Sequence, residues 1–311
     1  MSTLNIAFFG ECMVELSGKP LNKTFGGDTL NTALYLARLL SHHPINIHYA
    51  TGLGEEALSD DLLTAWHSEG IHTDLVSRVP NKNPGLYLVE TDEHGERSFH
   101  YWRTDSAATH YFDAISPLEH AIENQDIDAL YLSGISLAIL SDEAKARLLL
   151  CVKRLKIQNK TVFFDNNFRP QLWSATRARQ WYRDILRHTD VALITEDDDM
   201  LVWGDTKIVE RCKSFGCEQL VIKRGSEPCV VISDLQTDAK HVEVSATHVT
   251  NVVDTCAAGD SFAAGFLAGY LTQQSPTECA ELGHALAGVV IQFPGAIVPI
   301  AHTEPFHLTG A

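Results

Sequence analysis

The stretch Asn251-Val-Val-Asp-Thr-Cys-Ala-Ala-Gly-Asp-Ser-Phe262 decides how the rest of the chain is interpreted. It begins in a β-favouring run at residues 249–253 and passes through a patch of very small side chains. Apolar residues at helical spacing follow, among them Phe266 and Tyr270. The pattern predicts a strand that ends in a tight turn, with a helix opening directly after the turn.

Small side chains at this turn favour binding of an anion. Ala257, Ala258 and Gly259 leave their backbone N–H groups open to a ligand, and a helix N-terminus attracts negative charge. A carboxylate at Asp260 would repel a bound phosphate. The combination makes sense if Asp260 takes a proton from an attacking hydroxyl while the N–H groups hold the phosphoryl group in transfer. The alternative is a capping aspartate beside a close helix–strand contact.

Composition favours one large soluble domain spanning residues 1–311. The net charge of −16 argues against nucleic-acid or anionic-membrane partners. Seven cysteines occur without a Cys-x-x-Cys pair, which fits reduced thiols and a cytoplasmic location. The N-terminus lacks a basic leader, and no apolar run is long enough to span a membrane.

Strand and helix patterns alternate along most of the chain. Strands are predicted at residues 4–9, 45–50, 129–132, 161–164, 191–195 and 219–223. Helices are predicted from an Asp28 cap, and at residues 58–68, 141–156, 177–187, 207–215, 259–271 and 277–292. This alternation predicts an α/β fold with a doubly wound, mainly parallel sheet, whose site lies beyond the carboxyl ends of the strands.

A hairpin at residues 85–103 interrupts the alternation and predicts a separate small β-sheet. Its second strand places Phe99, Tyr101 and Arg103 on one face. With part of residues 11–25 we expect it to form a lid over the site. Exposed lid edges would be a liability, so we expect a homo-oligomer that pairs two lids.

The signature strings resemble those of a known family. No Gly-x-x-x-x-Gly-Lys-[Ser/Thr] loop is present. Instead, Asp-Thr-Cys-Ala-Ala-Gly-Asp at residues 254–260 resembles the C-terminal signature of ribokinase-like (PfkB) carbohydrate kinases, and residues 25–33 resemble the N-terminal one. The resemblance covers nearly the whole chain. It implies a ribokinase-like fold, phosphorylation of a sugar hydroxyl, and ATP and Mg²⁺ as cofactors.

Within that family the chain resembles the bacterial 2-keto-3-deoxygluconate kinases. The stretches that carry this resemblance are residues 10–17, 25–31, 84–87, 101–103, 132–140 and 165–170. The resemblance implies 2-keto-3-deoxy-6-phosphogluconate as the product. A fructokinase, a ribokinase or a nucleoside kinase of the same fold remains an alternative, as does a non-catalytic sugar-acid sensor.

Candidate sugar-binding residues lie in the early Gly-Gly motif, the hairpin and the stretch after residue 165. They are Gly27, Asp28, Asn31, Tyr87, Tyr101, Arg103 and Arg169. Two arginines suit an acidic sugar, because an arginine fork matches a carboxylate. The alternatives are that Asp28 only caps its helix, that Asn31 lies on the surface and that the aromatic residues only pack.

Candidate nucleotide-binding residues are implied by the resemblance. They are Asn167, Lys223, Gly225, Ser226, Ala287, Gly288 and Ile291. The family's Asn-x-x-Glu magnesium motif falls on Glu196 and Asp199, and both residues depart from it; carboxylates still suit magnesium. Carbonyl groups near Asp254 and Cys256 are candidates for a monovalent cation, as in some relatives.

Overall fold

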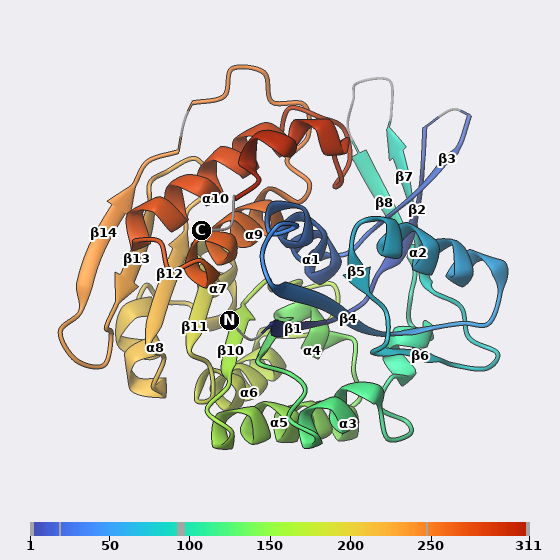
Figure 1. Cartoon of the computed structure of the whole chain (residues 1–311), viewed down its shortest axis with the longest axis horizontal. Helices are drawn as coiled ribbons and strands as arrows, with labels where there is room; N and C mark the ends of the chain where they lie inside the picture. The colour runs from blue at the N-terminus through green and yellow to red at the C-terminus, as the bar shows by residue number, and fades with distance from the viewer. Residues whose placement is uncertain (1–2, 19, 92–96, 247, 309–311) are drawn as a thin grey trace.

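A large, mainly parallel sheet forms the centre of the molecule (Figure 1). The computed structural model describes residues 3–18, 20–91, 97–246 and 248–308. In pairing order, the strands are β14 (Lys240–Val244), β13 (Cys229–Ser233), β12 (Gln219–Lys223), β11 (Val191–Thr195), β10 (Thr161–Asp165), β9 (Ala129–Ser133), β1 (Leu4–Phe9), β4 (Ile45–Leu53) and β5 (Ile71–His72), with β6 (Val76–Arg78) also beside β4. Only the β12–β13 and β13–β14 pairs of these described strands are antiparallel. The predicted mainly parallel sheet is confirmed.

Helices cover both faces of this sheet, because alternate strand residues point to opposite sides. Phe8 and Phe163 pack in one apolar cluster, while Phe9 and Phe164 pack in the other. The first cluster includes residues of α1 (Asp28–Leu39), α2 (Ala57–Ser68), α9 (Ala258–Leu271) and α10 (Pro276–Val290). The second includes residues of α3 (Pro117–Glu123), α4 (Gly134–Ala138), α5 (Asp142–Ile157), α6 (Ala175–Leu186), α7 (Glu196–Trp203) and α8 (Ile208–Phe215). The fold is therefore doubly wound.

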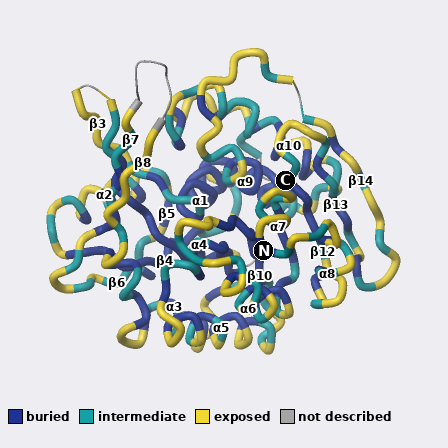
Figure 2. The backbone as a smooth tube through the Cα atoms, turned by 180° about the vertical axis from the view of Figure 1, so that it is seen from behind, coloured by how far each residue is buried: buried dark blue, intermediate teal, exposed yellow. Residues whose placement is uncertain are grey.

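A second, smaller sheet projects from one end of the molecule (Figure 1). Its strands, in order, are β3 (Asn22–Gly26), β2 (Met13–Ser17), β7 (Gly85–Thr91) and β8 (Arg97–Trp102). β7 and β8 form the predicted hairpin, whose expected turn at residues 92–95 lies outside the described residues. The outer parts of β3 and β8 are exposed, whereas the strands of the large sheet are mostly buried (Figure 2).

The remaining described elements are three short 3₁₀ turns, η1 (Ala107–His110), η2 (Ile300–His302) and η3 (Glu304–Phe306). Within the described residues, no helix combines the length and the apolar character that crossing a membrane requires.

Two local predictions were wrong. Residues 249–253 form no strand: the N–H groups of Val253 and Asp254 both donate to the carbonyl of Ile291, at the end of α10. β-branched residues favour extended backbone, but a strand also needs a strand partner. Asp28 does not cap α1 either. Gly27 is the N-cap, and Asp28 is the first helical residue.

Candidate active site

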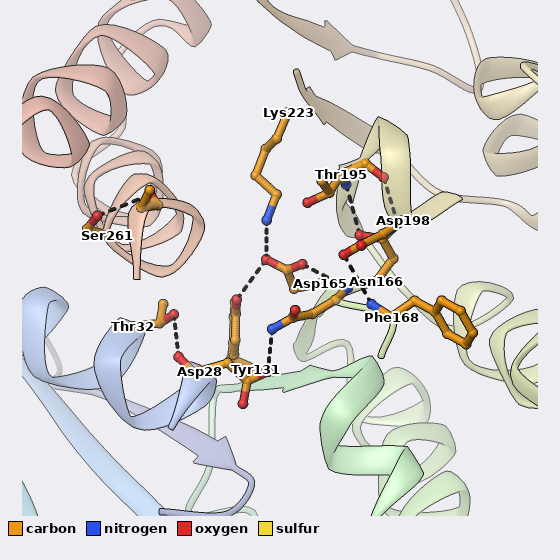
Figure 3. A network of polar contacts seen from close by, with 12 residues as sticks. Asp28, Thr32, Tyr131, Asp165, Asn166, Phe168, Thr195, Asp198, Lys223 and Ser261 are labelled. Atoms are coloured by element: carbon orange, nitrogen blue, oxygen red, sulfur yellow. Dashed lines mark hydrogen bonds and ion pairs between the residues drawn. The ribbon is translucent and has the colours of Figure 1, made fainter. Parts of the chain in front are cut away.

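The candidate site lies where the carboxyl ends of the parallel strands meet the first turns of α1 and α9 (Figure 3). Glu11 follows β1, Asp165 ends β10 and Lys223 ends β12. Parallel strands bring their carboxyl ends to one edge, so residues that are distant in sequence converge there. The candidate residues predicted from the sequence include Lys223 at this edge.

Asp260 stands in the first turn of α9, and its carboxylate is held by α1. Its Oδ2 accepts a hydrogen bond of 2.8 Å from Asn31 Nδ2. Asn31 is buried, so it is not the surface residue of the alternative interpretation. Burial and the nearby Asp28 raise the pKa of Asp260 to about 7, while the Asn31 hydrogen bond and Lys223 act in the opposite direction. A carboxyl with this pKa can exchange a proton near neutral pH.

A left-handed residue shapes the turn before α9. Ala257 has φ 58° and ψ 13°, and it is the N-cap of the helix. The N–H of Ala258 donates to the Thr255 carbonyl at 3.2 Å, so this predicted anion donor is engaged within the turn. Gly259 is exposed, and a Cβ atom there would lie 3.8 Å from Lys223 Nζ. The helix tip therefore combines a bare backbone with a lysine ammonium.

Asp254 anchors the same turn. Its Oδ1 accepts from Cys256 N at 3.0 Å, and its Oδ2 accepts from Gly295 N at 2.7 Å. Both oxygens thus hold backbone, including a segment that follows α10. These contacts fix the loop near which a monovalent cation was predicted.

Asp28 lies opposite, at the start of α1. Its Oδ2 accepts from Asn167 Nδ2 at 2.7 Å. Its Oδ1 is buried and has no hydrogen bond of normal geometry in the described part of the chain. Burial raises the pKa of Asp28, and the Ser133 hydroxyl partly offsets that effect. Gly27 must lack a side chain, because a Cβ atom would come within 2.2 Å of the Glu11 carbonyl. A hydrogen-bond donor on a ligand would satisfy the unpaired oxygen.

Asp165 forms a buried centre that sequence reasoning missed. Lys223 Nζ donates to Asp165 Oδ2 at 2.5 Å, and the Tyr131 hydroxyl donates to the same oxygen at 3.2 Å. Asn166 bonds the backbone of Thr195 through both ends of its amide, which joins β10 to β11 (Figure 3). The sequence signal that could have indicated this centre is the run of polar residues directly at the end of a buried strand.

The acidic start of α7 contributes a different residue from the one predicted. Asp199 turns away from the site, since its Oδ2 accepts from Arg211 of α8. Asp198 faces the site edge: its Oδ2 accepts from Phe168 N at 3.2 Å (Figure 3). The same oxygen accepts from Arg169 Nη1 at 3.3 Å. Adjacent helical residues point about 100° apart, so only one of the two can face this edge. Glu196 is exposed at the first helical position.

Two of the sugar-binding candidates at the small sheet, Arg103 and Tyr87, already have carboxylate partners. Arg103 Nε donates to the buried Glu11 Oε2 at 2.8 Å, and Nη2 donates to the same oxygen. The predicted carboxylate ligand Arg103 is therefore already paired. Tyr87 is buried and donates its hydroxyl to Glu15, whereas Tyr101 is 52% exposed and packs near the Tyr87 ring.

The nucleotide-binding candidates fall into three places. Asn167 lies at Asp28, as described above, and Gly225 and Ser226 form the turn after β12 beyond Lys223, where Gly225 has φ 60°. Ala287 and Gly288 lie near the end of α10, and Ile291 follows it. The Ile291 carbonyl connects α10 to Val253 and Asp254, which lead into the turn before α9. Backbone hydrogen bonds thus link the end of α10 to the turn before α9.

Comparison with known proteins identifies the family. The sequence pattern of the pfkB family carbohydrate kinases matches residues 3–303. The chain belongs to this family. Among relatives of this kinase, the 2-dehydro-3-deoxygluconokinase of Dickeya dadantii (strain 3937) is 45% identical over 310 residues, which cover 96% of this chain and 98% of the relative. The protein of that name from Escherichia coli (strain K12) is 42% identical over 302 residues, covering 94% and 97%.

Solved structures share the fold of this carbohydrate kinase. The 2-dehydro-3-deoxygluconokinase of Thermotoga maritima superposes with a TM-score of 0.79 at 23% identity, covering 97% of this chain and 98% of that one. A putative ribokinase II from E. coli in complex with ATP and Mg²⁺ gives 0.82 at 18% identity, covering 97% and 98%. The predicted ribokinase-like fold is confirmed.

Proposed function

We propose that this carbohydrate kinase transfers the γ-phosphoryl group of ATP to 2-keto-3-deoxygluconate, also called 2-dehydro-3-deoxygluconate, and forms 2-keto-3-deoxy-6-phosphogluconate. Relatives that are 42–45% identical over almost the whole chain carry the corresponding name. The observation that carries the chemistry is Asp260, whose carboxyl has a pKa of about 7 at the tip of α9. We propose that residues 1–311 act as one kinase domain.

Asp260 is the base in this proposal. Its carboxylate accepts the proton of the terminal sugar hydroxyl as the hydroxyl oxygen forms a bond to the γ-phosphorus and the bond to the leaving ADP oxygen breaks. Asn31 orients the carboxylate through the 2.8 Å hydrogen bond. A positioned base of this kind commonly contributes about 10²- to 10⁴-fold to the rate.

The tip of α9 and Lys223 stabilise the phosphoryl group. The N–H groups of Ala257 and Gly259 form the anion hole, without that of Ala258, which is bonded to Thr255, and the absent side chain of Gly259 leaves room beside Lys223. We propose that ATP binds to Asn167, Gly225, Ser226, Ala287, Gly288 and Ile291. Bound Mg²⁺ neutralises phosphate charge in reactions of this kind. We assign it to Glu196 and Asp198, since Arg211 already neutralises Asp199.

The arginines favour an acidic sugar. Arg103 is paired with Glu11, so Arg169 offers the less compensated guanidinium: its side chain is 47% exposed, and its Asp198 contact is 3.3 Å long. We propose that Arg169 meets the sugar carboxylate and that Arg103 completes its binding. Gly27, Asp28, Tyr87 and Tyr101 surround the sugar, and the small sheet closes as a lid that excludes water.

The decisive experiment compares substrates with ATP in excess. We expect ADP formation with 2-keto-3-deoxygluconate at a kcat/KM well above the values for fructose, ribose and adenosine. A higher value for fructose or ribose would assign the chain to another sugar-kinase activity of the family. Saturable binding of the sugar acid without ADP formation would indicate a sensor.

We also propose that two lids pair in a homo-oligomer. Phe99, Tyr101 and Trp102 of β8 are 46%, 52% and 59% exposed, which is unusual for such large apolar side chains. Sedimentation velocity on the wild type and on Trp102→Lys tests the pairing. A monomeric wild type would reject it.

A further inference from the structure

We propose that His48, His72 and Asp74 form a binding site for a divalent transition-metal ion such as Zn²⁺, separate from the kinase site. His48 belongs to β4 and His72 to β5, and the two residues are partners in the parallel register. One ligand atom from each of the three side chains lies within 4.8 Å of the others. Two imidazoles and a carboxylate are a common protein ligand set for zinc.

The polar contacts around His48 show which ring nitrogen faces a cation. Asn5 Nδ2 donates to the Asp126 carbonyl at 2.9 Å, and Asn5 Oδ1 accepts from Asn46 Nδ2 at 2.9 Å. These two bonds fix the orientation of the Asn5 amide. Its Oδ1 lies 3.4 Å from His48 Nε2. An amide oxygen only accepts, so with the imidazole proton on Nε2 this contact is a long hydrogen bond and Nδ1 keeps its lone pair.

The other nitrogen of His48 then presents its lone pair to a carboxylate. His48 Nδ1 lies 2.8 Å from Asp74 Oδ1, and both atoms are acceptors in the tautomer with the proton on Nε2. A shared metal ion would satisfy both of these acceptors. A proton on Nδ1 would join the same two atoms, whereas a metal ion also engages the second imidazole. His72 stacks on His48 with ring centroids 4.8 Å apart and supplies a third ligand.

The geometry suits a small ion. Zinc–nitrogen bonds of about 2.0–2.1 Å place tetrahedral ligand atoms roughly 3.3 Å apart. The separation of His48 Nδ1 and Asp74 Oδ1 is 2.8 Å, so a small outward shift of Asp74 would admit the ion. The side chain of Asp74 is 61% exposed and His72 is also exposed, so both can adjust, whereas His48 is buried and fixed. Water would complete the coordination.

The position of the site predicts an effect on stability and none on turnover. His48 precedes the carboxyl end of β4 by five residues, which is about 16 Å along a strand. The ion would fasten β5, a strand of two residues at the edge of the sheet, to the buried β4. An ion bound only by the folded chain at about 100 times its Kd raises the ratio of folded to unfolded molecules roughly 100-fold.

The test is isothermal titration calorimetry with Zn²⁺, without nucleotide, on the wild type, His72→Gln, Asp74→Asn and the control His120→Gln. His120 is an exposed histidine on α3. We expect one zinc site in the wild type and the control, and at least tenfold weaker binding in the other two variants. Thermal unfolding should show a zinc-dependent rise in Tm in the wild type and the control alone, with kcat unchanged in all.

Two results would overturn the proposal. Equal zinc affinity in the wild type and in Asp74→Asn and His72→Gln would place the ion elsewhere, for instance at thiols or in the kinase site. Absence of saturable binding up to millimolar zinc would leave only a proton between His48 and Asp74. Asp74 is exposed, so Asp74→Asn keeps the test valid even if His72→Gln folds poorly.

Discussion

The pKa of Asp260 results from a small number of named neighbours. Burial and the negative charge of Asp28 disfavour the ionised form, while Asn31 and Lys223 favour it. Lys223 is itself bound to Asp165, so its charge is shared between two carboxylates. A base tuned in this way is about half ionised at neutral pH and can hold a proton after transfer.

Asp260→Asn should keep the fold and remove the base. We expect kcat to fall by about 10²- to 10⁴-fold with little change in the Kd for ATP. Steady-state kinetics and nucleotide binding measure the two effects. Asp238→Asn, at an exposed position, is the matched control. Turnover within a few-fold of the wild type would refute the role of Asp260.

The pH dependence of kcat/KM should follow the ionisation of Asp260. Because the base acts when deprotonated, activity should rise with pH through about 7. Asn31→Ala removes a hydrogen bond to the ionised Asp260 carboxylate, so the rise in activity should move to higher pH. Asp28→Asn removes a repelling charge and should move it to lower pH. Shifts of the same sign in both variants would contradict this assignment.

At the scale of elements, α9 and α10 pack through glycines. A Cβ atom on Gly265 would lie 2.7 Å from the Leu282 carbonyl, and one on Gly283 would lie 2.8 Å from the Phe262 carbonyl. The close contact positions the start of α9, and with it Asp260. Beyond the end of α10, the Ile291 carbonyl holds Val253 and Asp254, which lead into the turn before α9.

Two glycine substitutions in α10 should have opposite effects on stability. Gly283→Ala forces backbone apart and should lower the free energy of unfolding by about 1–3 kcal/mol. At Gly288 a Cβ atom would meet Val249 at 3.4 Å, an ordinary contact. Gly288→Ala should therefore be neutral or stabilising by up to about 1 kcal/mol, because alanine favours the helix. Urea unfolding compares them; equal destabilisation would show that the α9 contact does not decide the cost.

At the scale of the whole molecule, a buried ion pair connects the small sheet to the large one. Glu11 follows β1 and Arg103 follows β8, and the Ser106 hydroxyl donates to the remaining Glu11 oxygen. Burial raises the pKa of Glu11, and Arg103 offsets that effect. The pair holds the base of the small sheet against the large sheet.

Arg103→Met should affect stability and sugar binding separately. Alone, it leaves Glu11 uncompensated and should cost about 3–5 kcal/mol of stability. The double variant Glu11→Gln/Arg103→Met should recover most of that stability. If Arg103 also contacts the sugar acid, the KM for the acid stays about 10- to 100-fold raised in the double variant, as expected for a lost charged hydrogen bond. Thermal unfolding and kinetics measure both, and a restored KM would limit Arg103 to the ion pair.

The sequence by itself determined the alternating α/β fold, the small sheet and the helix that begins beside Asp260. These features follow from short-range patterns: apolar periodicity, small residues at a turn and capping residues. The strand predicted at residues 249–253 was wrong, because a strand also requires a neighbouring strand to pair with. No strand formed there, and the N–H group of Val253 reaches the Ile291 carbonyl instead of a strand partner.

Only the tertiary structure decided which charged and polar side chains meet. Asn31 and Asp260 are 229 residues apart, Arg103 and Glu11 are 92 apart, and Lys223 and Asp165 are 58 apart. The same packing brought Asp198 to the site and turned Asp199 to Arg211. Local sequence does not encode these choices, because each depends on where two separately formed elements pack.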